Sequence, residues 1–467
     1  MSEGLEVVRA ALAGEAAWLV GGAMRDRLLG RDTEDLDLVV AGDAEATARA
    51  IALQGRGTAF GLSEEFGAWR VVGPGRAWQV DVSTLAGATI EEDLARRDFT
   101  VNAMAELLAD PRLVDPFGGA ADLEGRVLRM VGPQAFDADP LRVARLVRHA
   151  VELDFTVDPA TADAARTSAP GLDRVAAERV FAELRRIIAV PEPAAGIALL
   201  DEVGALAVAI PELDALHGVQ QSDFHHRDVW GHTLLVLEAA AGLQRDPGAA
   251  FGEHAEAVGA VLAEPLADDL TRGQALRWGA LLHDVAKPPT RRVTDSGRVT
   301  FLGHDGLGAD MSRAILTRLR TSERLRGHVA ALARHHLRLG FLVHERPLSR
   351  RAIHAYLRAC TPVEVDVTVL SVADRLATGG RNADAAIEAH LELAREMLAH
   401  ALPWHAEGPP APLVRGDELA RELDIAGGPE LGRMLAELAA AQFAGEIDTR
   451  EDAVNRAREL LRRPAGG

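Results

Sequence analysis

The sequence has almost no cysteine and almost no lysine. Among its 467 residues, Cys360 is the single cysteine and Lys287 the single lysine. One cysteine cannot form an internal disulfide, so a disulfide-stabilised secreted scaffold is excluded and a reducing compartment is expected. No apolar run reaches the roughly 18 residues that span a bilayer, and the N-terminal region lacks the pattern of a signal peptide. We therefore expect a cytoplasmic protein with no membrane partner.

The sequence also lacks an excess of positive charge. It has 51 basic and 70 acidic residues, for a formal net charge of −19. This balance excludes a protein coated with positive charge but not a local nucleic-acid site. The tract 310–360 holds eleven arginines and three acidic residues, which fits a solvated helix face as well as a nucleic-acid-binding surface. With 48% hydrophobic and 26% charged residues, a largely disordered chain is excluded.

Two regions of different composition follow each other along the chain. Residues 1–130 contain short β-branched runs separated by helix-like stretches such as 44–53, which indicates one sheet with helices packed on it. The strand-like runs are 18–20, 36–40 and 78–82. From about residue 139 onward, Ala, Leu, Arg and Glu at helical spacing dominate. The proline-rich stretch 402–414 predicts a linker.

A glycine pair follows the first strand-like run. Gly21 and Gly22 allow the backbone to approach a ligand closely, and free amides at a helix N-terminus can hold phosphate oxygens. Arg25 adds a guanidinium that can bind the same phosphates. Gly-Gly turns are common, so this pattern requires support from neighbouring motifs.

Two aspartates enter the second strand-like run at alternate positions. Alternate residues of a strand share a face, so Asp35 and Asp37 are expected side by side. Neighbouring carboxylates repel, and a hard divalent cation bound by both relieves the repulsion. Mg²⁺ held there could activate an attacking hydroxyl and stabilise a departing pyrophosphate. Because the phosphate turn lies just upstream, we favour this interpretation over a solvated turn. Asp81, on the later strand, is either a third carboxylate ligand or an edge-strand surface residue.

A regular series of arginines begins where the α/β region ends. Asp139 and Pro140 are expected to open a helix, with Asp139 as its cap. Arg142, Arg145 and Arg148 follow at intervals of three and therefore share one side of that helix. An exposed basic surface would have the same pattern, but its regularity beside a phosphate turn favours nucleotide contact.

The order of these motifs resembles the class II tRNA nucleotidyltransferases, which are the CCA-adding enzymes and the bacterial poly(A) polymerases. The five matching motifs are Gly21-Gly22 to Asp26 together with Asp35-Leu-Asp37, then Arg96-Arg-Asp-Phe-Thr-Val-Asn-Ala103, Asp115-Pro-Phe-Gly-Gly119 with Asp122-Leu123, Asp139-Pro-Leu-Arg142 and 177–184. They lie in the family's order over roughly residues 15–190. Five motifs in this order are not expected by chance.

The resemblance implies a polymerase-β-like nucleotidyltransferase head followed by a helical neck. It implies Mg²⁺ binding by Asp35 and Asp37. It also implies contacts with the nucleotide triphosphate from Gly22, Arg25 and Arg97.

The same resemblance gives the arginine series a role in reading the base. Asp139 and Arg142 would contact the base edge of incoming CTP or ATP. A carboxylate accepts from the exocyclic amine of cytosine or adenine, while a guanidinium donates to ring acceptors. Arg145 and Arg148 would lie near the nucleotide. The family often has a second acidic residue where this chain has Ala138, which leaves open how the base-reading pair is held.

The second half of the chain is rich in histidine. Nine of the 16 histidines lie between positions 225 and 336. The adjacent pair His283-Asp284 lies in an apolar stretch, where burying it without a partner would be costly. A histidine, such a pair and a distant aspartate on separate helices can converge on one divalent ion.

This pattern resembles the HD phosphohydrolase superfamily. By that resemblance the ligands of a divalent transition metal would be His232, His283, Asp284 and Asp374. His304 and one of His335 or His336 would bind a second metal or the phosphate, and Lys287 would lie near the substrate phosphate. The histidines at 225–226 are expected to be surface or packing residues. An HD domain fused to a CCA-adding enzyme implies hydrolysis of 2′,3′-cyclic phosphates or phosphomonoesters.

The sequence therefore predicts an α/β head followed by three helical regions. The expected domains are a head at 1–138, a neck at 139–215, an HD domain at 216–400 and a linker with a tRNA-binding tail at 401–467. The expected activity adds all or part of the 3′-terminal CCA to tRNA from CTP and ATP, with no obligate protein partner.

Four other interpretations remain open. Within the same family these are a poly(A) polymerase and an enzyme that adds only CC or only A. Outside it, the chain could be an HD phosphohydrolase that uses its head as an RNA clamp, or a catalytically silent protein that binds RNA or senses nucleotides. The last is disfavoured because both sites keep their charged residues.

Overall fold

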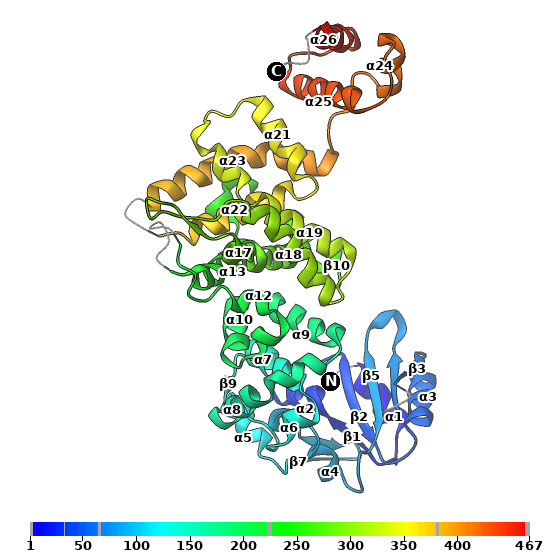
Figure 1. Ribbon diagram of the computed structural model, residues 1–467. Coiled ribbons are helices and arrows are strands. Elements are labelled where there is room, and N and C mark those ends of the chain that lie inside the picture. The colour runs from blue at the N-terminus through cyan, green and yellow to red at the C-terminus, as the bar shows by residue number, and fades with distance from the viewer. Residues whose placement is uncertain (1–2, 32, 64–66, 222–226, 380–382, 463–467) are drawn as a thin grey trace. The chain divides into compact units, whose positions relative to one another are not determined.

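The chain folds into two compact units (Figure 1). The computed structural model describes residues 3–31, 33–63, 67–221, 227–379 and 383–462. The first unit comprises Met1–Val190 with Ala198–Ala209, and the second comprises Pro191–Ile197 with Ile210–Gly467. The segments expected to form the head and most of the neck thus belong to one compact unit.

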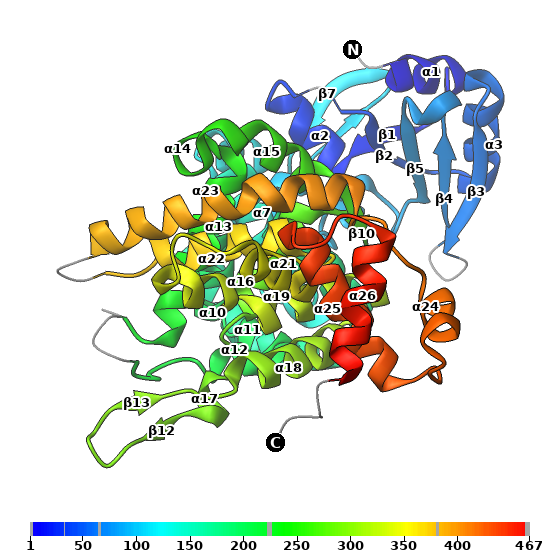
Figure 2. The same ribbon diagram turned by 90° about the horizontal axis from the view of Figure 1, so that it is seen from above.

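The first unit is built on a mixed seven-stranded sheet. Its strands are β1 Ala17–Val20, β2 Asp35–Val40, β3 Thr58–Ser63, β4 Ala68–Val72, β5 Gln79–Thr84, β6 Ala105–Leu107 and β7 Asp110–Val114. Their order is β3-β4-β5-β2-β1-β6-β7, in which β2 and β5 are parallel and the other neighbours antiparallel. Figure 2 shows β3, β4 and β5 side by side. The three predicted strands correspond to β1, β2 and β5, and the α/β fold class of the head is confirmed.

Helices lie before and between the strands in sequence, and further helices follow the last strand of the sheet. They are α1 Glu3–Ala11, α2 Gly21–Leu28, α3 Ala44–Gly55, α4 Ile90–Leu94, α5 Gly119–Glu124, α6 Ala135–Ala138, α7 Arg142–Leu153, α8 Pro159–Ser168, α9 Ala177–Ala189 and α11 Ala205–Ala209. Two short parallel strands, β8 Val127–Leu128 and β9 Thr156–Val157, pair with each other; β8 follows α5 and β9 follows α7. Helix α10, Pro193–Glu202, crosses the division between the units.

Helices α1 and α3 pack against the apolar face of the sheet. Leu36 and Trp78 are almost fully buried there, and a Cβ added at Gly4 of α1 would lie 3.0 Å from Trp78 Cβ. Because strand residues alternate between faces, Asp35 and Asp37 lie on the opposite face. The apolar core therefore determines which face of the sheet is left for polar chemistry.

The helix expected to open at Pro140 begins two residues later, at Arg142. Asp139 is extended, with φ −149°, and its carboxylate accepts a hydrogen bond from the Leu141 amide at 3.2 Å. The Asp139 carboxylate therefore stabilises the turn that precedes α7 and does not cap the helix itself.

The second unit is almost entirely helical. Its helices are α12 Pro211–Asp214, α13 Val229–Arg245, α14 Gly248–Phe251, α15 Ala255–Ala263, α16 Arg272–Leu282, α17 Lys287–Thr290, α18 His304–Arg318, α19 Glu323–His335, α20 Arg338–Phe341, α21 Arg350–Cys360, α22 Glu364–Leu376, α23 Ala383–Glu407, α24 Gly416–Leu423, α25 Pro429–Ala444 and α26 Arg450–Arg462. Two small hairpins, β10 Pro265–Ala267 with β11 Leu270–Thr271 and β12 Arg292–Val293 with β13 Val299–Thr300, interrupt them. Helices α13, α16, α19 and α22 form the centre of the bundle. No helix in the described segments is long and apolar enough to cross a membrane.

The linker expected at 402–414 is shorter in the structure. Helix α23 continues through Pro403 to Glu407, and Trp404 anchors this end because its buried indole donates to Thr361 Oγ1 at 2.9 Å. Packing of the tryptophan thus overrides the local signal of the proline. After α23, helices α24 to α26 form a small core of their own.

Most arginines of the tract 310–360 are paired within the second unit. For example, Arg318 pairs with Glu212, and Arg351 pairs with Glu437 and Glu446 of the C-terminal helices. Distant carboxylates therefore neutralise much of the charge that the local composition predicts.

A buried ion network joins three helices of the second unit. The Asp366 carboxylate in α22 is fully buried and accepts from the Arg272 guanidinium in α16. His328 Nε2 in α19 lies 3.4 Å from the same carboxylate. Each of these side chains depends on the others, because an unpaired buried charge is costly.

We predict that Asp366→Ala lowers the free energy of unfolding of the second unit by about 3–5 kcal/mol, since it leaves Arg272 buried without its partner. The matched control is Arg313→Ala, which breaks an exposed ion pair with Glu323 and should cost less than about 1 kcal/mol. Urea titration followed by circular dichroism measures both. Equal losses would show that the buried network is not specifically stabilising.

Candidate active site and candidate metal centre

Three carboxylates lie on one face of the sheet in the first unit. The parallel register of β2 and β5 pairs Asp35 with Gln79 and Asp37 with Asp81. Paired residues of neighbouring strands point to the same side. Asp35 is exposed, whereas Asp37 and Asp81 are half-buried.

The three carboxylates differ in their partners. Asp81 accepts from Arg70 Nε and Nη2, both at 2.7 Å, so its charge is largely neutralised. Burial raises the pKa of Asp37, opposed by Arg97 and reinforced by Asp81. Asp35 forms no hydrogen bond or ion pair through its carboxylate with the described residues. An unpaired carboxylate beside a half-buried one fits a hard divalent cation, whereas Asp81 already has a cationic partner.

The glycine turn at the start of α2 lies against Asp37. Gly21 has φ +65°, and a Cβ there would lie 2.9 Å from Asp37 Oδ2 and 3.0 Å from Arg97 Nη1. The backbone amides of Ala23 and Gly22 stabilise the Asp37 carboxylate. Only glycine permits this close approach, so the turn, the aspartate and Arg97 form one unit of structure.

One cavity of about 680 Å³ brings together every candidate site residue of the first unit. Those lining it are Gly22, Arg25, Asp35, Asp37, Asp81, Arg97, Asp139, Arg142, Arg145 and Arg148. They come from strands β2 and β5, from helices α2 and α7, and from segments that precede α7. Residues more than one hundred positions apart in sequence thus share one site.

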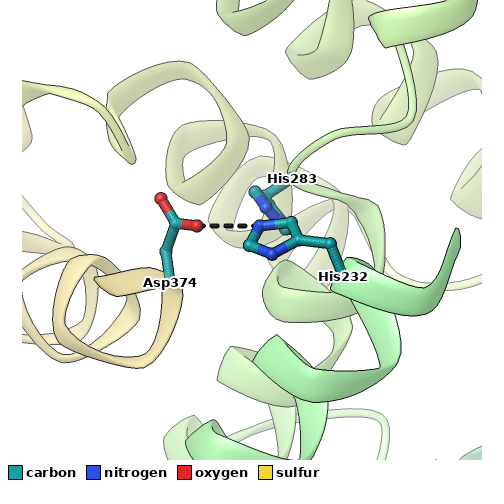
Figure 3. A group of neighbouring side chains, drawn as sticks. All are labelled: His232, His283 and Asp374. Atoms are coloured by element: carbon teal, nitrogen blue, oxygen red, sulfur yellow. Dashed lines mark hydrogen bonds and ion pairs between the residues drawn. The ribbon is translucent and has the colours of Figure 1, made fainter. Parts of the chain in front are cut away.

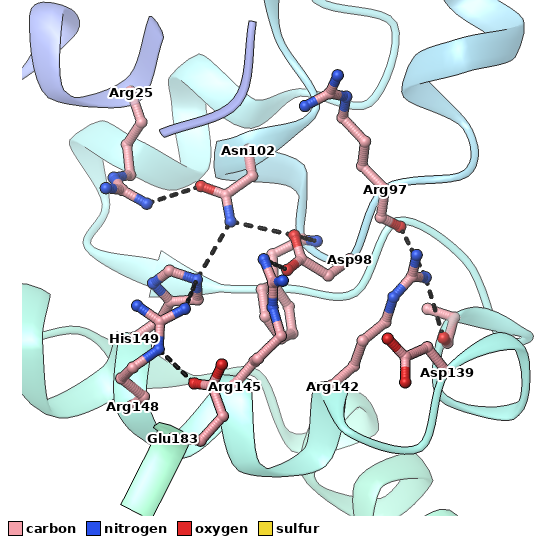
Figure 4. Close-up of polar contacts among 12 residues, drawn as sticks. Arg25, Arg97, Asp98, Asn102, Asp139, Arg142, Arg145, Arg148, His149 and Glu183 are labelled. Carbon is pink, nitrogen blue, oxygen red and sulfur yellow. Dashed lines mark hydrogen bonds and ion pairs between the residues drawn. The ribbon is translucent and has the colours of Figure 1, made fainter. Parts of the chain in front are cut away.

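A chain of hydrogen bonds crosses the wall of this cavity (Figure 4). Arg25 Nη1 donates to Asn102 Oδ1 at 2.8 Å, and Asn102 Nδ2 donates to Asp98 Oδ1 at 3.0 Å. Arg145 Nη2 lies 2.7 Å from Asp98 Oδ2. Burial acts to raise the pKa of Asp98, but Arg145 and further hydrogen bonds hold it below its ordinary value. Asp98 and Asn102 had no assigned role in the sequence, although both belong to the motif 96–103.

The base-reading candidates are held by backbone and by a distant arginine. Arg142 donates to the carbonyl oxygens of Arg96 at 2.6 Å, Arg97 at 3.2 Å and Ala135 at 3.0 Å. Arg179 Nη2 donates to Asp139 Oδ2 at 3.0 Å. Arg179, from the helical motif 177–184, therefore holds Asp139 in a chain that has Ala138 before it.

Arg148 is almost fully buried in the cavity wall. Its guanidinium donates to Glu183 and Glu152. Arg142, Arg145 and Arg148 share a helix side, as expected, but each has a different partner. They are three fixed positions instead of a free basic surface.

The second unit contains two adjacent groups of possible metal ligands. His232, His283 and Asp374 form one group, and Asp284, His304 and His336 form the other, with ligand atoms within 4.8 Å of one another in each. Figure 3 shows His232 and His283 facing Asp374, with His232 Nε2 2.9 Å from Asp374 Oδ1.

Asp284 connects the two groups. Its Oδ2 lies 3.1 Å from His283 Nε2 and 2.7 Å from Lys287 Nζ, and its Oδ1 lies 3.4 Å from His304 Nε2. Lys287 also donates to Gln221 Oε1 at 2.6 Å. Burial acts to raise the pKa of Asp284, but His283 and Lys287 hold it well below its ordinary range.

The orientation of the histidines fits metal binding. Nδ1 of His283, His304 and His336 contacts the carbonyl oxygens of Ala280, Phe301 and Ala333 at 2.8, 2.7 and 2.6 Å. A hydrogen bond from Nδ1–H to a carbonyl leaves Nε2 as the free ligand atom. Three imidazoles with carboxylates form a donor set suited to a divalent transition metal.

The structure separates the two neighbouring histidines that the sequence left open. His336 is 1% exposed and belongs to the second group, and burial lowers its pKa to about 4. His335 is half-buried, accepts from Arg338 Nε at 2.9 Å and belongs to neither group. The histidines at 225–226 lie outside the described residues.

Three family models match the chain. The poly A polymerase head domain matches residues 17–129, the probable RNA and SrmB-binding site of polymerase A matches 154–216, and the HD domain matches 229–379. These matches confirm both resemblances seen in the sequence.

Solved structures share the fold of the chain. CCA-adding enzymes in complex with ATP and with CTP superpose with TM-scores of 0.65 and 0.64, and the Thermotoga maritima CCA-adding enzyme complexed with tRNA has a TM-score of 0.62. Each comparison covers 98% of this chain and 95% of the other, at 18–19% identity. The expected combination of nucleotidyltransferase head, helical neck and HD domain is confirmed.

Three curated relatives match more than half of the chain, and two of them match 94% of it. The A-adding tRNA nucleotidyltransferase of Deinococcus radiodurans is 39% identical over 94% of both chains. The CC-adding enzyme of Thermus thermophilus is 34% identical over 94% of this chain and 92% of its own. The multifunctional CCA protein of Methylococcus capsulatus is 41% identical over 57% of this chain and 66% of its own. Identity at this level over so much of the sequence places the chain in the tRNA nucleotidyltransferase family, among the members that carry an HD domain.

Proposed function

We propose that the first unit transfers nucleotides from CTP, ATP or both to the 3′ end of tRNA and so adds all or part of CCA. The observation that carries this proposal is the single cavity in which the glycine turn, the carboxylates and the Asp139–Arg142 pair meet. The solved CCA-adding enzymes with ATP, CTP and tRNA support the choice of substrates.

In this reaction the 3′-hydroxyl oxygen of the RNA forms a bond to the α-phosphorus of the nucleotide, and the bond to pyrophosphate breaks. Asp35 and Asp37 would hold Mg²⁺, which when bound supplies positive charge for activating the hydroxyl and stabilising pyrophosphate. Arg25 and Arg97 would bind the triphosphate, helped by the amides at the start of α2. The bonds from Arg25 to Asp26 and Asn102 orient its guanidinium before the nucleotide arrives.

Asp139 and Arg142 would select the base. The Asp139 carboxylate can accept from the exocyclic amine of cytosine or adenine, and guanine and uracil offer no such donor at that position. Arg142 has five N–H donors and uses three of them on backbone carbonyls, so the others remain for the base. Arg179 donates to Asp139 and is not among the residues that line the cavity, so we assign it as a positioning residue.

We expect the wild-type protein with Mg²⁺ to extend tRNA transcripts and to stop at or before the complete CCA end. Transcripts ending at the discriminator base, after CC and after CCA, each with CTP or ATP, distinguish A-adding, CC-adding and complete addition by single-nucleotide sizing. Asp37→Asn should lower addition at least 1,000-fold, because it removes a metal-binding charge. A long A tail would instead indicate a poly(A) polymerase, and full activity in Asp37→Asn would contradict the metal assignment.

We predict that Arg142→Ala lowers the preference for CTP or ATP over GTP and UTP by roughly 10- to 100-fold, since a bidentate base contact is worth about 1–3 kcal/mol. Arg179→Ala should cause a smaller loss in the same direction, because Asp139 loses one of its two hydrogen bonds. Arg166→Ala, which removes an exposed arginine of α8, is the control. Competition between the four nucleotides measures the preference; unchanged selectivity in Arg142→Ala would exclude base reading by this residue.

We further propose that the second unit hydrolyses phosphate esters, with 2′,3′-cyclic phosphates and phosphomonoesters as substrates. Two adjacent groups of possible metal ligands support this proposal, and the Asp284 carboxylate contacts histidines of both groups. His232, His283, Asp284 and Asp374 would hold a divalent transition metal, which when bound provides a nucleophilic water at neutral pH. His304 and His336 would bind a second ion or the phosphate, and Lys287 would lie beside the substrate oxygen atoms.

We predict that His336→Ala lowers metal-dependent hydrolysis of a 2′,3′-cyclic nucleotide by at least 100-fold, because it removes a buried ligand atom. His335→Ala is the matched control and should retain hydrolysis, since this side chain belongs to neither group. Nucleotide addition should be unchanged in both variants. Hydrolysis that survives in His336→Ala, or is absent from the wild type with Mn²⁺, Co²⁺, Ni²⁺ and Zn²⁺, would contradict the proposal.

A further inference from the structure

A second cavity adjoins the active-site cavity on the carboxylate face of the sheet. Its volume is about 290 Å³, and Asp35 lines both cavities. Its other walls include Phe60 of β3, Arg70 of β4, Arg76 and Glu34. We call it the edge cavity, because it lies towards the β3 edge of the sheet. Apart from Asp35, none of its lining residues has a role in the binding of the incoming nucleotide described above.

The register of the strands places Phe60 on the same face as the carboxylates. Phe60 pairs with Arg70, Arg70 pairs with Asp81, and Asp81 pairs with Asp37 across β3, β4, β5 and β2. Residues paired across neighbouring strands point to one side of a sheet. The face therefore carries, in sequence from the edge, an aromatic ring, a guanidinium and the carboxylates.

The ring and one arginine of the edge cavity are available to a ligand. Phe60 is 43% exposed, a large apolar surface for a residue next to carboxylates. The Arg76 side chain forms no hydrogen bond or ion pair with the described residues, whereas Arg70 is tied to Asp81. An exposed aromatic ring with an unpaired guanidinium suits a nucleotide, because the ring stacks on a base and the guanidinium binds a phosphodiester. The exposed Glu34 carboxylate can accept hydrogen bonds from ribose hydroxyls.

The position of the edge cavity identifies which nucleotide it suits. The triphosphate is bound in the other cavity, between the glycine turn and Arg97. In an in-line displacement the attacking oxygen and the leaving pyrophosphate lie on opposite sides of the phosphorus. Asp35 is common to both cavities, so a hydroxyl presented from the edge cavity would meet the phosphorus beside the catalytic carboxylates.

We propose that the edge cavity receives the 3′-terminal nucleotide of the RNA acceptor, with its base stacked on Phe60 and its phosphodiester at Arg76. This inference rests on the proposed nucleotidyl transfer to RNA. On this proposal, β3 and the turn before β5 position the attacking hydroxyl, whereas other segments bind the incoming nucleotide.

The decisive experiment combines a protein change with a change in the RNA. A short acceptor-stem RNA that the wild-type protein extends is compared with the same RNA lacking only the base of its 3′-terminal nucleotide. We expect removal of the base to lower kcat/KM of the wild type about tenfold, and Phe60→Ala to lower kcat/KM on the intact RNA about tenfold. The two changes together should lower kcat/KM no more than either change alone, because both remove the same stacking contact. Phe60→Trp should keep the wild-type sensitivity to the base, since the indole also stacks.

Arg76→Ala should raise KM for the acceptor RNA about fivefold at low salt and leave KM for the incoming nucleotide unchanged. Leu113→Ala and Arg112→Ala, two exposed positions on β7 at the other edge of the same sheet, are the controls.

The inference would be overturned if Phe60→Ala lowered kcat/KM on the base-free RNA by a further tenfold. It would also be overturned if the Phe60→Ala protein extended intact RNA normally. A rise in KM for the incoming nucleotide, with none for the RNA, would assign the edge cavity to the other substrate and also overturn it. A wild-type protein that extends no RNA would instead contradict the proposed function itself.

Discussion

The mutual repulsion of carboxylates on one face of β2 and β5 is the constraint on which the first unit depends. The parallel pairing of these strands places Asp37 beside Asp81, with Asp35 two residues away. Their charges are tolerated because Arg70 neutralises Asp81, while Arg97 and the amides of α2 act on Asp37. The glycine at position 21 is required by the same arrangement, since a side chain there would collide with both Asp37 and Arg97. The apolar face, covered by α1 and α3, keeps the strands in the register that this arrangement needs.

The second unit meets the same electrostatic problem by burial and orientation. Its ligand groups are almost enclosed, and carbonyl oxygens of the backbone fix the rings of His283, His304 and His336. Asp284 remains charged because His283 and Lys287 face it. Both units thus concentrate carboxylates, one on an open sheet face and the other between helices, and each arrangement suits a cation.

The sequence predicted the parts of each site that depend on local spacing. Alternation in β2 was enough to place Asp35 and Asp37 on one face, and the motif order was enough to identify the family and the HD domain. The partners that hold these residues were not predictable, because they come from distant segments: Arg70 for Asp81, Arg179 for Asp139 and Glu183 for Arg148. For the same reason spacing could not decide between His335 and His336, since burial depends on how α18 and α19 pack. The start of α7 and the passage of α23 through Pro403 likewise reflect tertiary contacts.

The three carbonyl bonds of Arg142 have a consequence for how the family can diversify. The residue that would contact the base also supports the backbone at Arg96 and Arg97, and therefore the segment whose Arg97 side chain would bind the triphosphate. If Arg142 reads the base and Arg97 binds the triphosphate, as proposed, one side chain couples base preference to phosphate binding. On that proposal, exchanging Arg142 would alter the support of the backbone at Arg96 and Arg97 as well as the base preference. Evolution and protein engineering alike would find more freedom in the residues that surround this arginine than in the arginine itself.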